Sequence, residues 1–127
     1  MSTINWYGQS GRHFLCELYE LAWTEFNPVS AVYILSRVST LLPNGGSQHT
    51  ALYVGETESL VDRLNSGTVN HDGLKRALKA GATHVGIYRI DDPVQRVAIE
   101  TDLRHSLDPI CNRQSVPTLL GDLLTKA

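Results

Sequence analysis

The fold is decided by two short apolar stretches and the loop between them. Residues 31–35 read AVYIL, residues 50–55 read TALYVG, and residues 42–48 between them read LPNGGSQ. Both stretches are rich in β-branched and aromatic residues, which favour strands. The loop combines proline, asparagine and glycine, which are typical turn residues. The pattern predicts two antiparallel strands that form a hairpin.

Helices are predicted on both sides of this hairpin. A helix is expected between Gly11 and Asn27-Pro28, because apolar residues recur there at helical spacing: Phe14, Leu15, Leu18, Leu21 and Ala22. Short helices are expected at 58–66 and 72–80, a third strand at 83–90, a helix capped by Asp92 that ends near Leu107, and a short helix near 117–124. The fold class is therefore α/β (α+β), with a small three-stranded central sheet flanked by helices. Residues 1–28 are expected to form an N-terminal helical extension, and residues 29–127 a single compact unit.

Length and composition are those of one ordinary globular domain. The chain has 127 residues, of which 42% are hydrophobic and 19% charged. No apolar run approaches the roughly 20 residues that span a bilayer, and no signal peptide is visible, so a cytoplasmic protein without membrane contact is expected. Cys16 and Cys111 show no metal-ligand spacing, which argues against a zinc site or a disulfide framework.

The charge distribution does not by itself indicate a nucleic-acid-binding protein. The formal net charge is −2, whereas such proteins usually present a positive field. Residues 1–62 hold two arginines and six carboxylates (2 − 6 = −4), and residues 63–127 hold nine Lys/Arg and seven Asp/Glu (9 − 7 = +2). A modest basic face is therefore confined to the second half of the chain.

The two predicted hairpin strands each carry a tyrosine. A phenol beside a metal-bound water can accept or relay its proton, so Tyr33 and Tyr53 are candidate catalytic residues. The alternative is that both are simply good strand formers. Gly55 and Thr57, at the end of the second strand, allow close approach of a substrate, or serve as turn punctuation and as a helix cap.

Arg63 is the third candidate. In the helix expected at 58–66, Leu60 and Leu64 form the apolar side and Arg63 lies beside it. An arginine directed into a groove offers a planar fork that suits a phosphate and the charge that develops on it. The alternative is a solvated surface arginine.

Glu100 is the most informative acidic residue. It lies three residues from both Val97 and Leu103, which places it on the apolar side of its helix. A half-buried carboxylate needs a partner. Mg²⁺ is one such partner, since it takes one or two carboxylates together with waters and phosphate oxygens. An ion pair with Arg96 or Arg104 is the other.

Together these residues resemble the GIY-YIG nuclease superfamily. In that family Gly-Ile-Tyr on one strand is followed by Tyr-Ile-Gly on the next, then by an arginine, a helical glutamate and an asparagine. The matching elements here are Ala31-Val32-Tyr33, Tyr53-Val54-Gly55, Arg63, Glu100 and Asn112. The similarity covers residues 31 to about 114. The stretches GATHVGIYRI (81–90) and IETDLRHSLDPICNRQ (99–114) are similar to small stand-alone bacterial members.

The resemblance implies hydrolysis of phosphodiester bonds, with DNA as the expected partner, and one divalent metal, Mg²⁺ (or Mn²⁺). It implies that Glu100 holds the metal, that Arg63 stabilises the phosphate, and that Tyr33 or Tyr53 deprotonates the attacking water. Asn112 would steady the site, and Gly55 and Thr57 would lie beside the substrate. His71 occupies a position where the family often has His or Lys; its alternative is a loop histidine at the surface.

Two departures and two competing interpretations remain. Ala31 replaces the first glycine of the family pattern, and the loop at 42–48 lengthens the hairpin. One alternative is an inactive module on the same fold that binds nucleic acid or protein. The other is a protein-interaction domain or dimer that uses the N-terminal helix, with an exposed patch including Phe14, Leu18 and Leu21. The histidines without metal-ligand spacing are taken as background: His13, His49, His84 and His105.

Overall fold

The computed structural model describes residues 2–66 and 72–112. The elements in chain order are β1 (Thr3–Tyr7), β2 (His13–Glu20), η1 (Leu21–Trp23), β3 (Ala31–Leu41), β4 (Ser47–Thr57), η2 (Val61–Ser66), α1 (Asp72–Lys79), β5 (His84–Arg89), α2 (Pro93–Leu107) and η3 (Ile110–Asn112). The strands are labelled β and the α-helices α, while η1 and η3 are short 3-10 helices and η2 is a π-helix. The hairpin, the third strand predicted at 83–90 and the helices at 72–80 and 93–107 are confirmed. The helix expected at 58–66 is present as the shorter π-helix η2, which begins at Val61. The helix expected near 117–124 lies outside the described residues.

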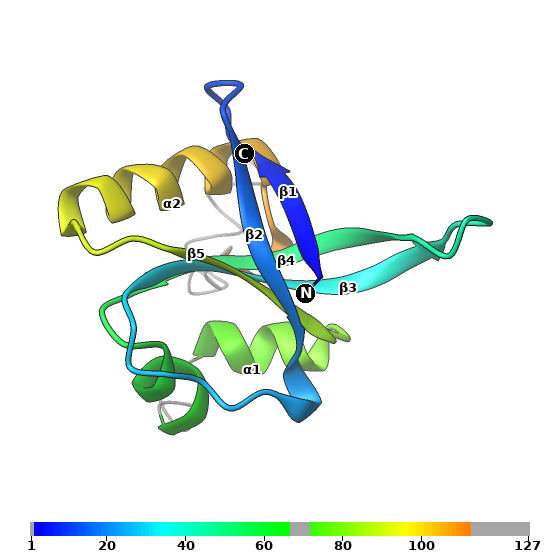
Figure 1. The fold of residues 1–127 in the computed structure, drawn as a ribbon, viewed down its shortest axis with the longest axis horizontal. Helices are drawn as coiled ribbons and strands as arrows, with labels where there is room; N and C mark the ends of the chain where they lie inside the picture. The colour runs from blue at the N-terminus through cyan, green and yellow to red at the C-terminus, as the bar shows by residue number, and fades with distance from the viewer. Residues whose placement is uncertain (1, 67–71, 113–127) are drawn as a thin grey trace, which may run out of the picture.

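The sheet has five strands in the order β1-β2-β5-β3-β4 and curls into a half-barrel (Figure 1). Every neighbouring pair is antiparallel. The α+β class with an antiparallel hairpin is therefore confirmed, and the three-stranded sheet is wrong. β4 forms one edge of the sheet and β1 the other.

The extra strands come from the segment that was predicted to be helical. Residues 13–20 form β2, in which Phe14 and Cys16 are buried while His13 and Leu15 are exposed. This alternation has the period of a strand, and it overrides the weaker helical spacing because β5 needs a second partner for its backbone groups. The N-terminal helical extension is wrong as a structure, and Phe14 is not available to an exposed docking patch.

Two hydrophobic layers cover the two faces of the sheet. On one face α1 places Leu74 and Ala77 against a core that includes Tyr33 and Leu35. On the other face α2 places Ile99 and Leu103 against a core that includes Trp6. Figure 1 shows β5, β3 and β4 between α2 above and α1 below. Side chains of successive β3 residues alternate between the layers, so Tyr33 belongs to the α1 face and Ile34 to the α2 face.

Helix α2 begins as the sequence predicts. The Asp92 side chain accepts a hydrogen bond from the Val94 backbone N–H at 3.0 Å, and a proline follows the cap. Its buried side is formed by Arg96, Ile99 and Leu103. Val97, which the sequence places on the apolar side of this helix, is 50% exposed. Its neighbour Arg96 is buried instead. Among the described helices, none has both the length and the apolar character needed to cross a bilayer.

Candidate active site

Tyr33 and Tyr53 lie side by side on the α1 face. Tyr33 pairs with Gly55, and Leu35 pairs with Tyr53, in the antiparallel register of β3 and β4. This register places both tyrosines on the same face. Their ring centroids are 6.1 Å apart. Tyr33 is fully buried and Tyr53 is half-buried.

Two glycines make room for these rings. A Cβ on Gly55 would lie 2.5 Å from the Tyr33 Oη and 2.9 Å from the Tyr53 Cε2. A Cβ on Gly73, in the first turn of α1, would lie 2.3 Å from the Tyr53 Cε1. The Tyr33 hydroxyl therefore lies directly over the β4 backbone, and α1 closes on the Tyr53 ring. The sequence indicated the close approach at Gly55 but gave no sign of the one at Gly73.

Arg63, from η2, interacts with both phenols. Hydrogen bonding to the Tyr33 hydroxyl raises the pKa of Arg63, and Tyr53 acts in the same sense. Burial raises the pKa of Tyr33, and the neighbouring Tyr53 raises it further, while the Arg63 guanidinium opposes the rise. Arg63 is exposed. A guanidinium has five N–H donors, so donors remain for an anion after two phenols are bound.

Asn112 holds the outer edge of β4 beside the tyrosines. Its side-chain amide donates to the Val54 carbonyl at 2.8 Å, and its carbonyl accepts from the Val54 N–H at 2.7 Å. Arg76 of α1 donates through Nη2 and Nε to the Cys111 carbonyl, at 2.8 and 3.0 Å. These contacts tie η3 to both β4 and α1. Asn112 is therefore a clamp on the backbone of Val54, the residue between Tyr53 and Gly55.

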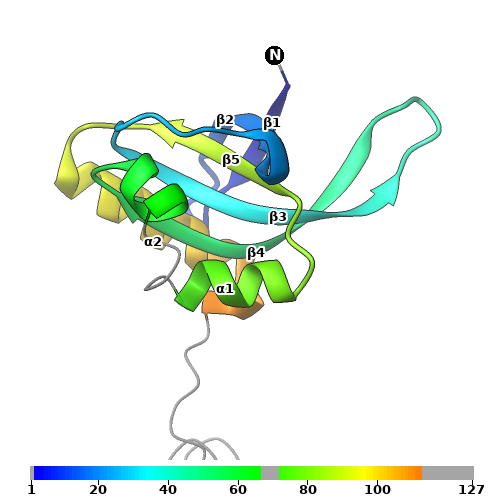
Figure 2. The ribbon, with the colours of Figure 1, turned by 90° about the horizontal axis from the view of Figure 1, so that it is seen from below.

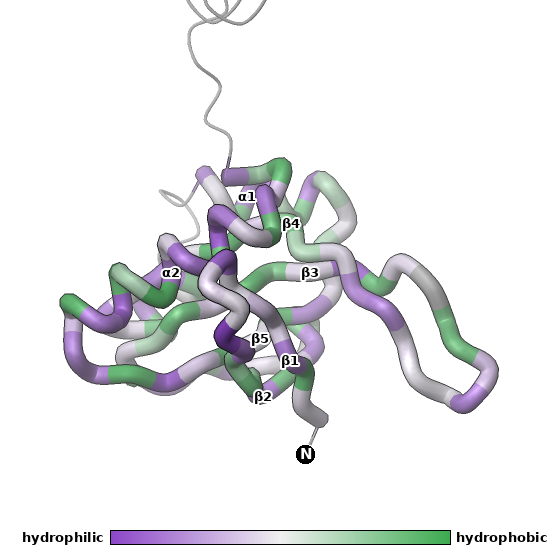
Figure 3. The backbone as a smooth tube through the Cα atoms, turned by 90° about the horizontal axis from the view of Figure 1, so that it is seen from above, coloured by the Kyte–Doolittle hydropathy of each residue, from purple (hydrophilic) through white to green (hydrophobic). Residues whose placement is uncertain are grey.

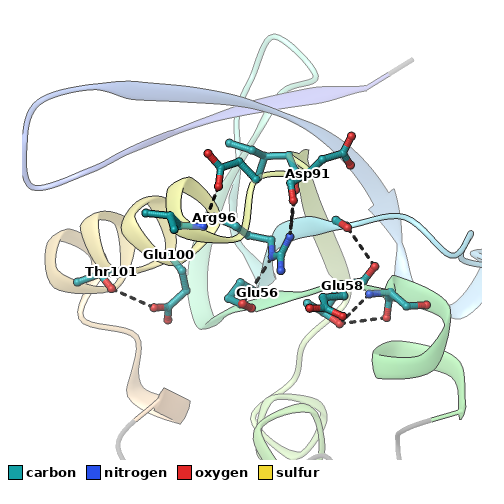
Figure 4. A network of polar contacts seen from close by, with 12 residues as sticks. Glu56, Glu58, Asp91, Arg96, Glu100 and Thr101 are labelled. Carbon is teal, nitrogen blue, oxygen red and sulfur yellow. Dashed lines mark hydrogen bonds and ion pairs between the residues drawn. The ribbon is translucent and has the colours of Figure 1, made fainter.

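Glu100 reaches the region from α2, on the other face of the sheet. Its side chain is 14% exposed, and Arg104 donates to it from Nε at 3.0 Å. The half-buried position expected for Glu100 is confirmed, with Arg104 as its ionic partner. Figure 4 shows its carboxylate on the same side of α2 as Glu56. Because α2 packs chiefly against the edge strand β4, Glu100 and the tyrosines approach that strand from its two faces.

Arg96 is a buried cation whose role the sequence did not reveal. It is 2% exposed, and its Nη1 donates to the Asp91 carbonyl at 3.1 Å. Its Nε lies 3.5 Å from the Glu56 carboxylate, next to Gly55 on β4 (Figure 4). The position of Arg96 one turn before Glu100 was the available signal. Arg96 therefore links α2 to β4. This contact also holds Glu100, one turn further along α2, at a fixed position relative to β4.

The remaining predicted site residues differ in how far the structure describes them. Thr57 forms a compact turn, in which its Oγ1 accepts from the Ser59 N–H and donates to the Ser59 carbonyl, each at 3.1 Å. This hydroxyl stabilises the entry to η2, which carries Arg63. His71 lies outside the described residues. Ala31 is fully buried on the α1 face, where its methyl group packs in the core.

Two histidines to which the sequence assigns no role form a cluster at the end of the sheet. The His49 and His84 rings meet edge to face with centroids 4.9 Å apart. The Ser36 hydroxyl lies 3.1 Å from His49 Nδ1, and Ser47 Oγ lies 3.2 Å from His49 Nε2. Burial lowers the pKa of His49, and His84 lowers it further. His49 and His84 are far apart in sequence, so only the sheet register brings them together.

The arrangement is suited to binding and activating an anionic oxygen centre. Tyr33, Tyr53 and Arg63 converge from three elements, and Glu100 supplies a carboxylate near the same strand. Within residues 2–66 and 72–112 there is no group of three or more His, Cys, Asp or Glu that could hold a metal ion. A Mg²⁺ ion bound through one carboxylate, waters and substrate oxygens does not need such a group.

No protein-family model, curated protein or solved structure matches the chain. The resemblance to GIY-YIG nucleases therefore rests on the residues named above and on their arrangement.

Proposed function

We propose that this chain is a metal-dependent endonuclease of the GIY-YIG type that hydrolyses phosphodiester bonds of DNA. The observation that supports this proposal best is the convergence of Tyr33, Tyr53 and Arg63 over Gly55. The two tripeptides of the family pattern meet at one register pair, in which Tyr33 lies opposite Gly55. Chance strand-forming tyrosines do not require a glycine beneath them or an arginine between their hydroxyls.

Arg63 is the proposed phosphate-binding residue. Its contacts with Tyr33 and Tyr53 orient the guanidinium before substrate arrives, and its exposure leaves it accessible. A guanidinium fork matches two phosphate oxygens and stabilises the extra charge of the transition state. Such preorganised donors are worth about 2.7–4 kcal/mol each in comparable sites.

Tyr33 is the proposed residue that orients and deprotonates the attacking water. Its burial favours the neutral phenol, while Arg63 favours the phenolate. Because burial leaves the pKa of Tyr33 above its ordinary value, the phenol must first release its own proton to solvent, which the positive charge of Arg63 and of a bound metal ion would favour, before its oxygen can take a proton from the water. Tyr53 is the second phenol of the pair and is proposed to share in orienting the water.

Glu100 is the proposed ligand for Mg²⁺ or Mn²⁺. The donor set fits, because Mg²⁺ is usually held by one or two carboxylates and completes its shell with waters and phosphate oxygens. Glu100 is half-buried and approaches the edge strand that carries Tyr53 and Gly55. The ion supplies Lewis-acid activation of the phosphate and of a bound water. Arg96 and Asn112 are proposed to hold Glu100 and β4 in place.

A second function is supported by the charge of the protein. The formal net charge is −2, and Glu100 already has Arg104 as a partner. These observations suit a module that binds nucleic acid or protein on the same fold without cleaving it. Ala31, which replaces the first glycine of the family pattern, does not favour this alternative, because its methyl group packs in the core and leaves the Tyr33–Arg63 contact in place.

The test is nicking of supercoiled plasmid with Mg²⁺ or Mn²⁺ against an EDTA control. Tyr33→Phe and Glu100→Ala are expected to abolish nicking. The matched controls Tyr88→Phe, on the neighbouring strand, and Glu17→Ala, a surface ion-pair residue, should nick like the wild type. If the folded wild type nicks nothing with either metal, the nuclease proposal is wrong and the binding module becomes the better one.

A further inference from the structure

The β3–β4 hairpin projects far beyond the rest of the sheet. β5 accompanies β3 only as far as the pair Ser36–His84, whereas β3 and β4 remain paired to Leu41–Ser47. Residues 37–50, called here the ribbon, therefore stand out as two strands (Figures 2 and 3). A two-stranded ribbon without a third strand is stabilised poorly by itself, so its length calls for an explanation.

The ribbon has an ordered tip. The Leu42 N–H donates to the Gly46 carbonyl at 2.8 Å, and the Gly45 N–H donates to the Leu42 carbonyl at 3.0 Å. Asn44 Oδ1 accepts from the Gly46 N–H at 3.0 Å, and Gly45 adopts φ +87°, a conformation that favours glycine. A tip built in this way loses little conformational entropy when it binds.

The ribbon is also anchored at its base. His49 lies against Ser36 and His84, as described above. Arg37 donates through Nη1 to the Ala80 carbonyl, at the end of α1, at 3.1 Å. The ribbon is thus fixed to β5 and α1, and its direction relative to the body is set by packed side chains.

The ribbon beyond Arg37 is uncharged, whereas its base is not. Residues 38–50 include no Lys, Arg, Asp or Glu. Their exposed side chains are mostly amides and hydroxyls, together with Leu41, which is 80% exposed. Amides, hydroxyls and an apolar group that can contact a thymine methyl are among the groups that read base edges.

Positive charge gathers where the ribbon meets the body. Helix α1 carries Lys75, Arg76 and Lys79, and Arg37 lies beside the end of that helix. Arg76 is only partly exposed and donates to the Cys111 carbonyl through two nitrogens. Arg37 donates to the Ala80 carbonyl through Nη1 alone, and both Arg37 and Lys79 are exposed. In Figure 2 the C-terminal end of α1 lies near the base of the ribbon. This arrangement matches a nucleic-acid duplex, in which uncharged base edges line the groove and charged phosphates lie along its two edges.

We infer that the ribbon enters the major groove of a DNA duplex while Arg37 and Lys79 bind phosphates at the groove edge. The major groove of B-DNA, about 12 Å wide, admits a two-stranded ribbon. The deep and narrow major groove of duplex RNA does not admit protein side chains. This inference rests on the proposed function, for which it names duplex DNA as the substrate.

The experiment measures binding without cleavage, by fluorescence anisotropy of a 30-bp DNA duplex (a length of roughly three helical turns) in EDTA and again with Ca²⁺. In the main variant, residues 39–48 are replaced by Asn-Gly, a two-residue turn that joins the paired residues Val38 and His49. Its dissociation constant for the duplex is expected to rise at least about 10-fold, while its weak binding to the single strand should stay the same.

A second variant keeps the inference testable if the shortened ribbon does not fold. Lys79→Gln is expected to reduce the slope of log K against log salt by about 0.9, the effect of one phosphate contact. Arg12→Gln is the matched control, because Arg12 is an exposed arginine at the β1–β2 turn that lies over Phe14. It should leave the slope unchanged.

The outcomes separate this inference from the proposed function. Loss of duplex binding in the shortened variant supports the ribbon inference whether or not the wild type nicks plasmid. Undiminished duplex binding by a folded shortened variant, or equal wild-type affinity for duplex DNA, single-stranded DNA and duplex RNA, overturns it even if nicking is metal-dependent. Absence of wild-type binding in both EDTA and Ca²⁺ also overturns it.

Discussion

Gly55→Ala tests whether the Tyr33–Tyr53–Arg63 arrangement carries out the chemistry. The added Cβ would lie 2.5 Å from the Tyr33 Oη and Cζ, whereas ordinary van der Waals contact begins at 3.4 Å. The phenol must therefore move by about 0.9 Å, the difference between these two distances. Tyr33 is fully buried, so its ring has no free space into which to turn.

This movement has consequences for both stability and rate. Overpacking of a buried site by one methyl group costs about 1–3 kcal/mol. A displacement of about 1 Å of a catalytic group lowers the rate roughly 100-fold. We expect Gly55→Ala to lower the free energy of unfolding by about 1–3 kcal/mol and the rate of metal-dependent nicking by about 100-fold.

Gly86→Ala separates the two effects. A Cβ on Gly86 would lie 3.3 Å from the Cys16 Cβ and from the Trp6 Nε1, in the layer on the other face of the sheet. This variant should lose stability, as measured by urea denaturation, and keep its nicking rate. The reasoning is refuted if Gly55→Ala is folded and nicks at the wild-type rate, or if both variants lose activity in proportion to their loss of stability.

Two further predictions concern the edge of β4 and the base of the ribbon. Asn112→Ala removes both side-chain partners of the buried Val54 backbone and should lower the free energy of unfolding by about 1–3 kcal/mol in urea; an equal loss in the exposed control Asn27→Ala would contradict this account. Burial and His84 lower the pKa of His49 below its ordinary 6.5. The unfolded chain therefore binds a proton at His49 more readily than the folded chain does. The stability that neutral His49 provides is present above pH 6.5 and is lost as the pH falls below that value. Urea unfolding from pH 7.5 down to about 5.5 should show this loss in the wild type and a weaker dependence in His49→Gln; an unchanged dependence in the variant would argue against it.

The local elements of the second half of the chain were accessible from the sequence. Asp92-Pro93 marks the start of α2, the turn residues near Asn44 mark the hairpin, and AVYIL and TALYVG mark its strands. Each of these signals acts within a few residues, through capping hydrogen bonds or through restricted backbone angles. The order Tyr33, Tyr53, Arg63, Glu100 and Asn112 was visible for the same reason, because a motif is a property of the linear chain.

The N-terminal segment shows where local patterns stop being decisive. Residues 13–20 satisfy both a helical and a strand spacing, and the choice falls to β5, which offers backbone partners for a whole strand. Burial of Phe14 and Cys16 beneath α2 is the gain that accompanies this choice. Neither the partner strand nor the covering helix is close in sequence, so the two competing patterns could not be ranked from the chain alone.

The sequence by itself determined which residues are chemically capable and in what order they occur. Only the tertiary structure decided which of them meet. The sheet register sets Tyr33 over Gly55 and places His49 against His84, and the packing of α2 buries Arg96 beside Glu56. These contacts join residues separated by more than twenty positions. They form because strand pairing and burial are settled over the whole chain at once, when backbone groups and apolar surface leave water together.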